Sequence, residues 1–469
     1  MASTSDPRTL GPSRARLGIE AALLVIAVLV VCLITMGAVT RYGPPMLFAP
    51  LLALALAFAA LRLLDDPVDV LCWFLFIIVN LDFLRIQGTR LTADILTSSM
   101  LLYAVLVRIG LAGSLAVRGR VEKAFLAYLL LTFISVVLSV DRPASLKNWG
   151  RDLEYWVLFV FLTTLALSER QRLRIALASV VSSVIPCLLG LAGMAFGIDA
   201  FYGAITPVEG GPWVKRVNGT LAHPVVFSEY LAFIATITLG LILLQKRWRT
   251  LLVSVFALQL VLLYLTYGRT GWIEFLISVI ALFWITGRRK VVFTVLPAMV
   301  MGVAFAVPTL LARMQNAFDL SNESDNSMLW RLGLWIYALK KFPQKPIFGS
   351  GQDTFIGYVA YGTQSINFRH RGGTGFAAHH TWINLLIETG LVGMLSFLVL
   401  IMTAGKSLKR RRSEPDGVRD PIVVGVSAAF VGLMVGSFAH DTFNLPCISV
   451  YFWVLLAVAL KPKAIAATP

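Results

Sequence analysis

Residues 378–412 read AHHTWINLLIETGLVGMLSFLVLIMTAGKSLKRRR. The middle of this stretch is apolar over roughly 20 residues, which is the length that crosses a bilayer as an α-helix. Five basic residues follow between positions 406 and 412. Lys and Arg collect at the cytoplasmic ends of membrane spans. The stretch therefore predicts a helix that enters the membrane at two histidines and leaves it at a basic cluster.

Similar apolar runs recur along the chain. Of its 469 residues 58% are hydrophobic and 14% are charged, whereas soluble chains carry about 25% charged residues. A soluble enzyme and a disordered chain are excluded, and continuous rather than alternating apolar runs exclude a membrane β-barrel. The predicted fold is all-α, a polytopic membrane helix bundle with about 12–14 transmembrane helices. The predicted spans are residues 17–39, 46–64, 68–84, 92–110, 121–140, 152–168, 172–197, 223–245, 249–268, 270–287, 290–312, 381–405, 420–440 and 444–461.

The basic residues also predict which side each loop faces. The chain has 41 basic and 25 acidic residues. When the spans alternate from a cytoplasmic N-terminus, every strongly basic short loop falls inside, as the positive-inside rule requires. Both termini are therefore expected in the cytoplasm, with the first run, 17–39, kept as a helix rather than cleaved as a signal peptide.

One predicted outer loop is much longer than the others. It spans residues 313–380 and is rich in Lys and Arg, and long loops are usually functional. Within it, residues 327–342 are amphipathic and are expected to lie along the membrane surface. The predicted organisation is an N-terminal tail (1–16), an N-terminal bundle (17–197), a region that carries the chemistry (198–400) and C-terminal helices with a short tail (401–469).

All five histidines fall at predicted outer positions. His380, Asn384 and Glu388 are spaced by four residues and share one helix face, whereas His379 points elsewhere. One imidazole can then face a substrate while the other supports the helix entry. The alternative is a helix-entry pair without chemistry.

Arginines occur beside these histidines at predicted outer turns. Arg269 lies in a short turn between two apolar spans, where an arginine is costly unless it is paired or meets an anion. Pairing with Glu274 and snorkelling to the interface are the alternatives. Lys215 and Arg216 precede a glycine turn. Arginine grips phosphate oxygens with a planar fork that stays charged. The sequence has no HExxH motif and no DxD-type pair of carboxylates on a predicted outer loop. Chemistry without a metal or cofactor is therefore predicted.

Four motifs in this order resemble those of the O-antigen ligase and Wzy-type polymerase superfamily. These are bacterial inner-membrane glycosyltransferases that use undecaprenyl-diphosphate-linked glycans. The matching stretches are Arg216 to Pro224, Thr266 to Trp272, Arg331 and Trp335 followed by Pro346, Gly349 and Gly351, and finally His379, Glu388, Gly390 and Gly393. A weaker echo occurs at His440 and Asp441. Counting back from Glu388 and Gly390 selects His379 as the family histidine.

The resemblance implies roles for these residues. Arg216 and Arg269 would hold the diphosphate of the donor, and Arg331 would bind donor or acceptor. His379 would activate the acceptor hydroxyl; with an ordinary pKa near 6.5 it would be mostly neutral. The remaining substrate-binding candidates are Lys215, His380, Trp335 and Glu388.

The implied partners are an undecaprenyl-diphosphate-linked glycan, an acceptor sugar on a lipid-linked repeat unit or lipid A core, and membrane lipid. Partners in a polysaccharide-assembly complex fit the same class, and nucleic acid does not. The expected location is the bacterial inner membrane, with the active site on the outer face. Ligase and polymerase activities stay open. A protein O-oligosaccharyltransferase, a transporter or flippase of lipid-linked sugars, and a purely structural assembly protein are the alternatives.

Overall fold

The computed structural model describes the larger part of the chain. The described residues are 67–80, 117–198, 201, 204–207, 213–221, 223–291, 293, 327–359 and 378–461. The predicted spans 17–39, 46–64 and 92–110 lie outside the described residues, as does nearly all of 290–312. The chain divides into two compact units, Met1–Phe74 with Leu84–Gly113 and Leu75–Phe83 with Ser114–Pro469. Everything that follows concerns the second unit, apart from the first half of one helix.

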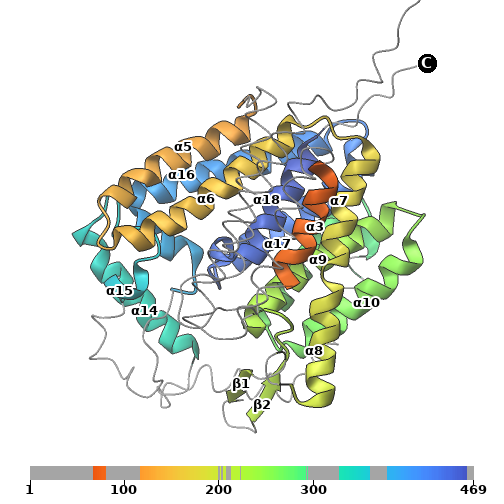
Figure 1. The fold of residues 1–469 in the computed structure, drawn as a ribbon, viewed down its shortest axis with the longest axis horizontal. Helices are drawn as coiled ribbons and strands as arrows, with labels where there is room; N and C mark the ends of the chain where they lie inside the picture. The colour runs from red at the N-terminus through yellow and green to blue at the C-terminus, as the bar shows by residue number, and fades with distance from the viewer. Residues whose placement is uncertain are drawn as a thin grey trace, which may run out of the picture. The chain divides into compact units, whose positions relative to one another are not determined.

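The described chain is mainly helical (Figure 1). Its α-helices are α3 (Pro67–Asn80), α5 (Arg120–Val137), α6 (Arg142–Thr164), α7 (Glu169–Val181), α8 (Val184–Phe196), α9 (Pro224–Leu244), α10 (Arg249–Leu265), α11 (Arg269–Ile285), α14 (Ser327–Lys341), α15 (Phe355–Val359), α16 (Thr381–Arg412), α17 (Pro421–Gly436) and α18 (Pro446–Leu460). Short 3-10 turns occupy Phe342–Gln344, Gly417–Arg419 and Thr442–Asn444. Two strands, β1 (Ala204–Pro207) and β2 (Trp213–Arg216), complete the described elements.

Three helical stretches of the described chain are long and apolar enough to cross a membrane. They are Glu169–Phe196, which holds α7 and α8, then α9, and then α16. Shorter apolar helices include α3, α10, α17 and α18. These features agree with an all-α membrane protein, while the number of spans and the outer position of residues 313–380 stay predictions. The predicted domain boundaries also stay predictions.

Two helices differ from their predicted spans for local reasons. α6 begins ten residues before the predicted start, because the Asp141 side chain caps it by accepting from the backbone N–H of Ala144 at 3.1 Å. Proline in the first turn suits this start. The predicted span 172–197 is two helices, because the chain turns at Ser182 and Ser183. Polar helix starts and internal turns of this kind are invisible to a search for apolar runs.

The β-hairpin is an addition to the predicted all-α architecture. β1 pairs with β2 in antiparallel register, with Ala204 opposite Arg216. After β2 the backbone N–H groups of Asn218 and Gly219 both donate to the carbonyl of Phe201. The hairpin therefore fixes the position of Arg216, which the sequence placed only in a loop.

α9 lies at the centre of the bundle. It packs against α10, α11 and α17, and nearly all its side chains are buried, as expected for a helix that is apolar all round. A Cβ on Gly240 would lie 2.9 Å from the Cα of Gly425 on α17. Small residues let membrane helices approach closely in this way. On the other side of the bundle, α5 packs on α16 and α6 on α18.

The helix ends define two opposite ends of this bundle. At the histidine end, defined by His223, His379, His380 and His440, α9, α11 and α16 begin and α17 ends. At the basic end, defined by Arg172, Lys406, Arg410, Arg411 and Lys461, α9, α16 and α18 end and α17 begins. Hydrogen bonds across helices tie each end together. They include Thr381 to the carbonyl of His440 and Arg411 to the carbonyl of Lys461.

α16 is interrupted at Gly390, and backbone groups of a loop form the hydrogen bonds that the interrupted helix does not make. Gly390 has φ 68° and ψ −170°, so the helix ladder breaks there. The freed carbonyls of Ile387 and Glu388 accept from the N–H groups of Ser350 and Gly351 at 3.0 and 2.8 Å. In return, the N–H groups of Leu391 and Val392 donate to the carbonyls of Pro346 and Ile347 at 2.9 and 3.1 Å. We call this contact between residues 346–351 and the break in α16 the glycine joint.

The glycine joint holds α14 over the start of α16. Ala338 and Phe355 form a buried apolar cluster with Ala378 and Ile387. The indole N–H of Trp335 donates to the carbonyl of Ala378 at 2.8 Å. The amphipathic stretch predicted at 327–342 is thus a helix, and it packs against the residues that open α16 (Figure 1).

Candidate functional site

The two adjacent histidines have different surroundings. His379 adopts φ 49°, a left-handed conformation that is uncommon for residues other than glycine. Its ring lies 5.2 Å, between centroids, from the ring of His440. His380 caps α16 instead, because its Nδ1 accepts from the backbone N–H of Ile383 at 3.3 Å. The ring of His380 meets Trp335 edge-on at 5.0 Å. The two imidazoles thus have different neighbours, although both residues precede the first residue of α16 and so do not follow the helical spacing that the prediction assumed.

The turn between α17 and α18 fixes His440 beside His379. Thr381 donates to the carbonyl of His440 through its backbone N–H at 3.2 Å and its hydroxyl at 3.0 Å. Next in the chain, Asp441 accepts from the side-chain amides of Asn384 at 2.8 Å and Asn444 at 3.2 Å. Burial raises the pKa of Asp441 to about 6, although the two amide hydrogen bonds oppose that rise.

A buried carboxylate lies behind His440. Oε2 of Glu229, on α9, is 3.5 Å from Nδ1 of His440 and accepts from the hydroxyl of Thr442 at 3.3 Å. Glu229 is fully buried. The sequence gave His440 and Asp441 only as a weak echo. Their grouping with Glu229 depends on the approach of α9 to the α17–α18 turn, which no local pattern encodes.

Arg216 connects the hairpin to the end of α10. Its Nε donates to the carbonyl of Thr266 at 2.7 Å, and Val217 donates from its backbone to the carbonyl of Leu265 at 3.3 Å. Arg216 is buried, with 7% of its surface exposed. Its positive charge acts on His223, the residue that caps α9. The hairpin thus carries Arg216 to the helix ends that hold the histidines.

Arg269 is the first residue of α11 and is exposed. α11 approaches α9 closely here, because Cβ atoms on Gly268 and Gly271 would lie 2.2 Å from Oγ and 2.6 Å from the carbonyl carbon of Ser228. The alternative of pairing with Glu274 is not observed. In the described structure neither carboxylate oxygen of Glu274 has a hydrogen-bond partner.

Arg331 reaches the same end from α14. One of its terminal nitrogens donates to the carbonyl of Ala439 at 3.2 Å. Burial, and next the positive charge of Arg269, lower the pKa of Arg331, while Glu229 raises it. Because the positive charges of Arg269 and Arg331 repel each other, an anion placed near both would be favourable.

The histidines at this end are held neutral. Burial, then the charges of Arg331 and His223, lower the pKa of His379 to about 4. Burial, then the charges of Arg216 and Arg331, lower the pKa of His223 to about 4. Burial, then the charges of His379 and Arg331, lower the pKa of His440 well below its ordinary value. The expectation that His379 keeps an ordinary pKa near 6.5 is therefore wrong, because burial and nearby arginines disfavour its charged form.

The four remaining predicted site residues lie in three places. Trp335 and His380 contact each other at the start of α16. Glu388 lies farther along α16, where its carboxylate accepts from the backbone N–H groups of Asp353 and Phe355, at 3.0 Å each. Lys215 is half-buried on β2. Their roles in substrate binding stay predictions, and the contacts of Glu388 are those of a residue that positions the glycine joint.

Taken together, one end of an apolar helix bundle holds three arginines, a buried carboxylate and three neutral histidines. Arginines of this kind bind diphosphate or carboxylate oxygens, and a neutral imidazole can accept a proton. Within the described residues, no group of three or more His, Cys, Asp and Glu is arranged to hold a metal ion. The fold defines an all-α membrane protein whose arginines and histidines gather at one end of the helix bundle.

Comparison with known proteins finds a family model that matches part of the chain. Residues 254–398 match the family model described as O-antigen ligase. The resemblance to the O-antigen ligase and Wzy superfamily is therefore confirmed. The matched range includes Arg269, Arg331 and His379, whereas Arg216 lies outside it.

The chain is also similar to a protein that is named for exopolysaccharide production. The chain is 28% identical over 149 residues to the exopolysaccharide production protein ExoQ of Rhizobium meliloti (strain 1021). The match covers 30% of this chain and 32% of that protein. The chain thus matches about a third of the length of this relative.

Proposed function

We propose that this protein transfers a glycan from an undecaprenyl-diphosphate-linked donor to an acceptor sugar, at the outer face of the bacterial inner membrane. The observation that carries the proposal is that three arginines and neutral His379 gather at one end of the bundle. Arg331 acts on His379 and is itself affected by Arg269, while Arg216 acts on the neighbouring His223. The match to the O-antigen ligase model supports the enzyme class. The name of the relative supports a product of the exopolysaccharide type.

The arginines bind the diphosphate of the donor. Arg269 is exposed at the start of α11, so its fork and the first N–H groups of that helix can face the same phosphate oxygens. Arg331 lies over them from α14 and is oriented by the carbonyl of Ala439. In the transition state the leaving diphosphate gains negative charge, which is the charge that preorganised arginines stabilise most strongly.

His379 accepts the proton of the acceptor hydroxyl. The hydroxyl oxygen then attacks the anomeric carbon, the bond from that carbon to the phosphate oxygen breaks, and undecaprenyl diphosphate leaves with the electron pair. General-base help of this kind contributes about 10²–10⁴-fold in rate. The ring of His440 lies beside that of His379, with centroids 5.2 Å apart, and Glu229 lies behind His440.

Donor binding also prepares the base. In the free protein burial, and next the positive charge of Arg331, lower the pKa of His379 to about 4. A bound diphosphate compensates the charge of Arg331, so the pKa of His379 rises when the donor arrives. His380 and Trp335 line the acceptor side, while Lys215 extends the basic surface of the donor side. Glu388 holds the glycine joint that keeps α14 in place.

The proposal is tested by glycan analysis of a deletion strain complemented with the wild-type protein or with His379→Ala. Surface polysaccharide and the undecaprenyl-linked pool are both sized, and membrane levels of the variants are matched by immunoblot. Single repeat units in place of long chains indicate a polymerase. Long chains that stay on the carrier and are missing from the acceptor indicate a ligase. Wild-type glycan with His379→Ala would refute the catalytic assignment and favour a transport role.

A further inference from the structure

A cavity lies at the basic end, opposite the arginine and histidine site. The ends of α5, α6, α16 and α18 surround it, and its volume is about 590 Å³, within the range of small-molecule sites. Six of its lining residues are basic, namely Arg118, Arg120, Lys406, Arg410, Arg411 and Lys461. Its acidic lining residues are Glu122 and Glu414. We call this cavity the basic pocket.

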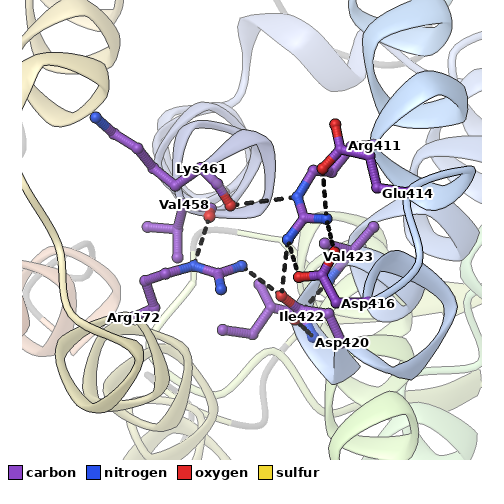
Figure 2. Close-up of polar contacts among 9 residues, drawn as sticks. All are labelled: Arg172, Arg411, Glu414, Asp416, Asp420, Ile422, Val423, Val458 and Lys461. Carbon is purple, nitrogen blue, oxygen red and sulfur yellow. Dashed lines mark hydrogen bonds and ion pairs between the residues drawn. The ribbon is translucent and has the colours of Figure 1, made fainter. Parts of the chain in front are cut away.

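Part of this positive charge is structural. Figure 2 shows Arg172 and Arg411 converging on Asp420. Arg172 pairs with Asp420 at 2.7 Å, and Arg411 pairs with Asp416 at 2.8 Å and with Glu414 at 2.9 Å. These ion pairs join the start of α7, the end of α16 and the start of α17. Arg411 and Glu414 therefore compensate each other without a ligand.

Lys461 is structural too. Its ammonium group donates to the carbonyl of Thr163 near the end of α6. Basic residues at the carboxyl ends of helices compensate the exposed carbonyls and the helix dipole. Because Lys461 follows α18 and reaches the end of α6, compensation of helix carboxyl ends accounts fully for its position.

The same explanation fails for the basic residues from α5. Arg118 and Arg120 lie at the amino end of that helix, where the dipole disfavours positive charge. The N-cap of α5 is Gly119, which makes no side-chain cap hydrogen bond. The amino end of α5 therefore presents two arginines to one side of the pocket, and they attract an anion. The carboxylate of Glu122 lies against Gly119 at the same helix end and compensates part of this charge.

Lys406 and Arg410 of α16 face the pocket from another side. They are spaced by four residues, so they lie on one helix face and repel each other. Among the residues that the structure describes, no carboxylate pairs with either of them or with Arg118 or Arg120, and all four are exposed. The hydroxyl-bearing residues Thr403 and Ser407 line the same wall. Four cations without a carboxylate partner around one cavity favour the binding of an anion.

We infer that the basic pocket binds a phosphate group, carried either by the headgroup of an anionic phospholipid or by a soluble phosphate compound. Phosphate matches the mixture of arginine forks, a lysine, hydroxyls and a helix amino end. Ala457 and Leu460 supply an apolar inner wall, which suits an acyl chain beside the headgroup. This site is independent of the glycan-transfer proposal, since it shares no residue with it.

The test uses the purified full chain and a pair of matched double variants. Lys406→Gln with Arg410→Gln removes two pocket charges. Lys246→Gln with Arg288→Gln removes two exposed charges at the same end that do not line the pocket. Lipid retention is counted by native mass spectrometry from nanodiscs of phosphatidylcholine with or without one-fifth phosphatidylglycerol. In parallel, the shift in thermal unfolding temperature is titrated with inorganic pyrophosphate.

Each basic residue contributes about fivefold to the binding of an anionic surface, so the pocket variant should bind about 30-fold more weakly than wild type, and the control should be unchanged. Retained phosphatidylglycerol that is lost only in the pocket variant identifies a lipid headgroup. Stabilisation by pyrophosphate that is lost only in the pocket variant identifies a soluble phosphate. The inference is overturned if the wild type shows neither lipid retention nor stabilisation by pyrophosphate. It is also overturned if both double variants lose the effect equally. Glycan production in a complemented strain checks separately that the pocket variant folds.

Discussion

Replacing Gly390 by alanine should open the glycine joint. The backbone conformation at Gly390, φ 68° and ψ −170°, is almost exclusive to glycine and costs other residues on the order of 1–3 kcal/mol. An added Cβ would also lie 2.3 Å from the carbonyl oxygen of Ile347. The loop must then withdraw from α16, and this weakens the four backbone hydrogen bonds of the joint, each worth ~1 kcal/mol. The sum is a local destabilisation of roughly 5–7 kcal/mol.

The measurement is amide hydrogen exchange of the purified chain, followed by mass spectrometry of peptides that cover residues 346–359 and 381–395. In the Gly390→Ala variant the amides of Ser350, Gly351, Leu391 and Val392 should exchange at least about a hundredfold faster than in wild type. Gly333→Ala is the matched control, because Gly333 lies on α14 with open space around it. That control should stabilise α14 slightly, by about 0.5–1 kcal/mol. Wild-type exchange rates in the Gly390→Ala variant would refute the account of the joint.

Three further predictions concern the site. Arg269→Lys should lower transfer activity by about 10–100-fold, because one charge-assisted hydrogen bond of the fork is lost; Arg289→Lys at the other end of α11 is the control, and full activity of Arg269→Lys would contradict the diphosphate role. For His379, the acid limb of kcat/KM should fall near the free-protein pKa of about 4, and the acid limb of kcat should lie at higher pH because bound donor raises that pKa; coincident limbs would contradict the charge coupling. The raised pKa of Asp441, about 6 against an ordinary 3.8, favours its protonated form in the folded state, so its contribution to stability is complete below pH 4 and is lost as pH rises through 6. Asp441→Asn should therefore flatten the dependence of the unfolding temperature on pH between 4 and 6, and an unchanged profile would be evidence against a buried, titrating Asp441.

The sequence predicted much of the helical architecture because long apolar runs are a strong signal. The predicted span 223–245 is α9, Pro224–Leu244, and the amphipathic stretch is α14. The turn at Ser182 and the early start of α6 escaped prediction, since each depends on a few polar residues next to apolar ones. The hairpin escaped because each of its strands has only four residues.

The candidate site was predicted in part for a different reason. Arginines and histidines in membrane spans are rare and costly, so Arg269 and His379 stood out individually. Their grouping with His440 and Glu229 depends on how α9, α14, α16 and the α17–α18 turn meet, and that is a long-range property. The low pKa of His379 follows from the same packing. It could not be inferred from a sequence in which an outer loop suggested ordinary solvation.

The glycine joint has a consequence for protein engineering. Its four contacts are all between backbone groups, so they do not depend on which side chains Ile347, Ser350, Leu391 or Val392 carry. What they demand is glycine at the positive-φ positions Gly349, Gly351 and Gly390. The segment that carries Arg331 and Trp335 is thus fastened mainly by backbone hydrogen bonds, to which the carboxylate of Glu388 and the hydroxyl of Ser350 add side-chain contacts. Segments from related proteins that keep these glycines should be interchangeable here, and such chimeras offer a direct way to transplant acceptor preference from one scaffold to another.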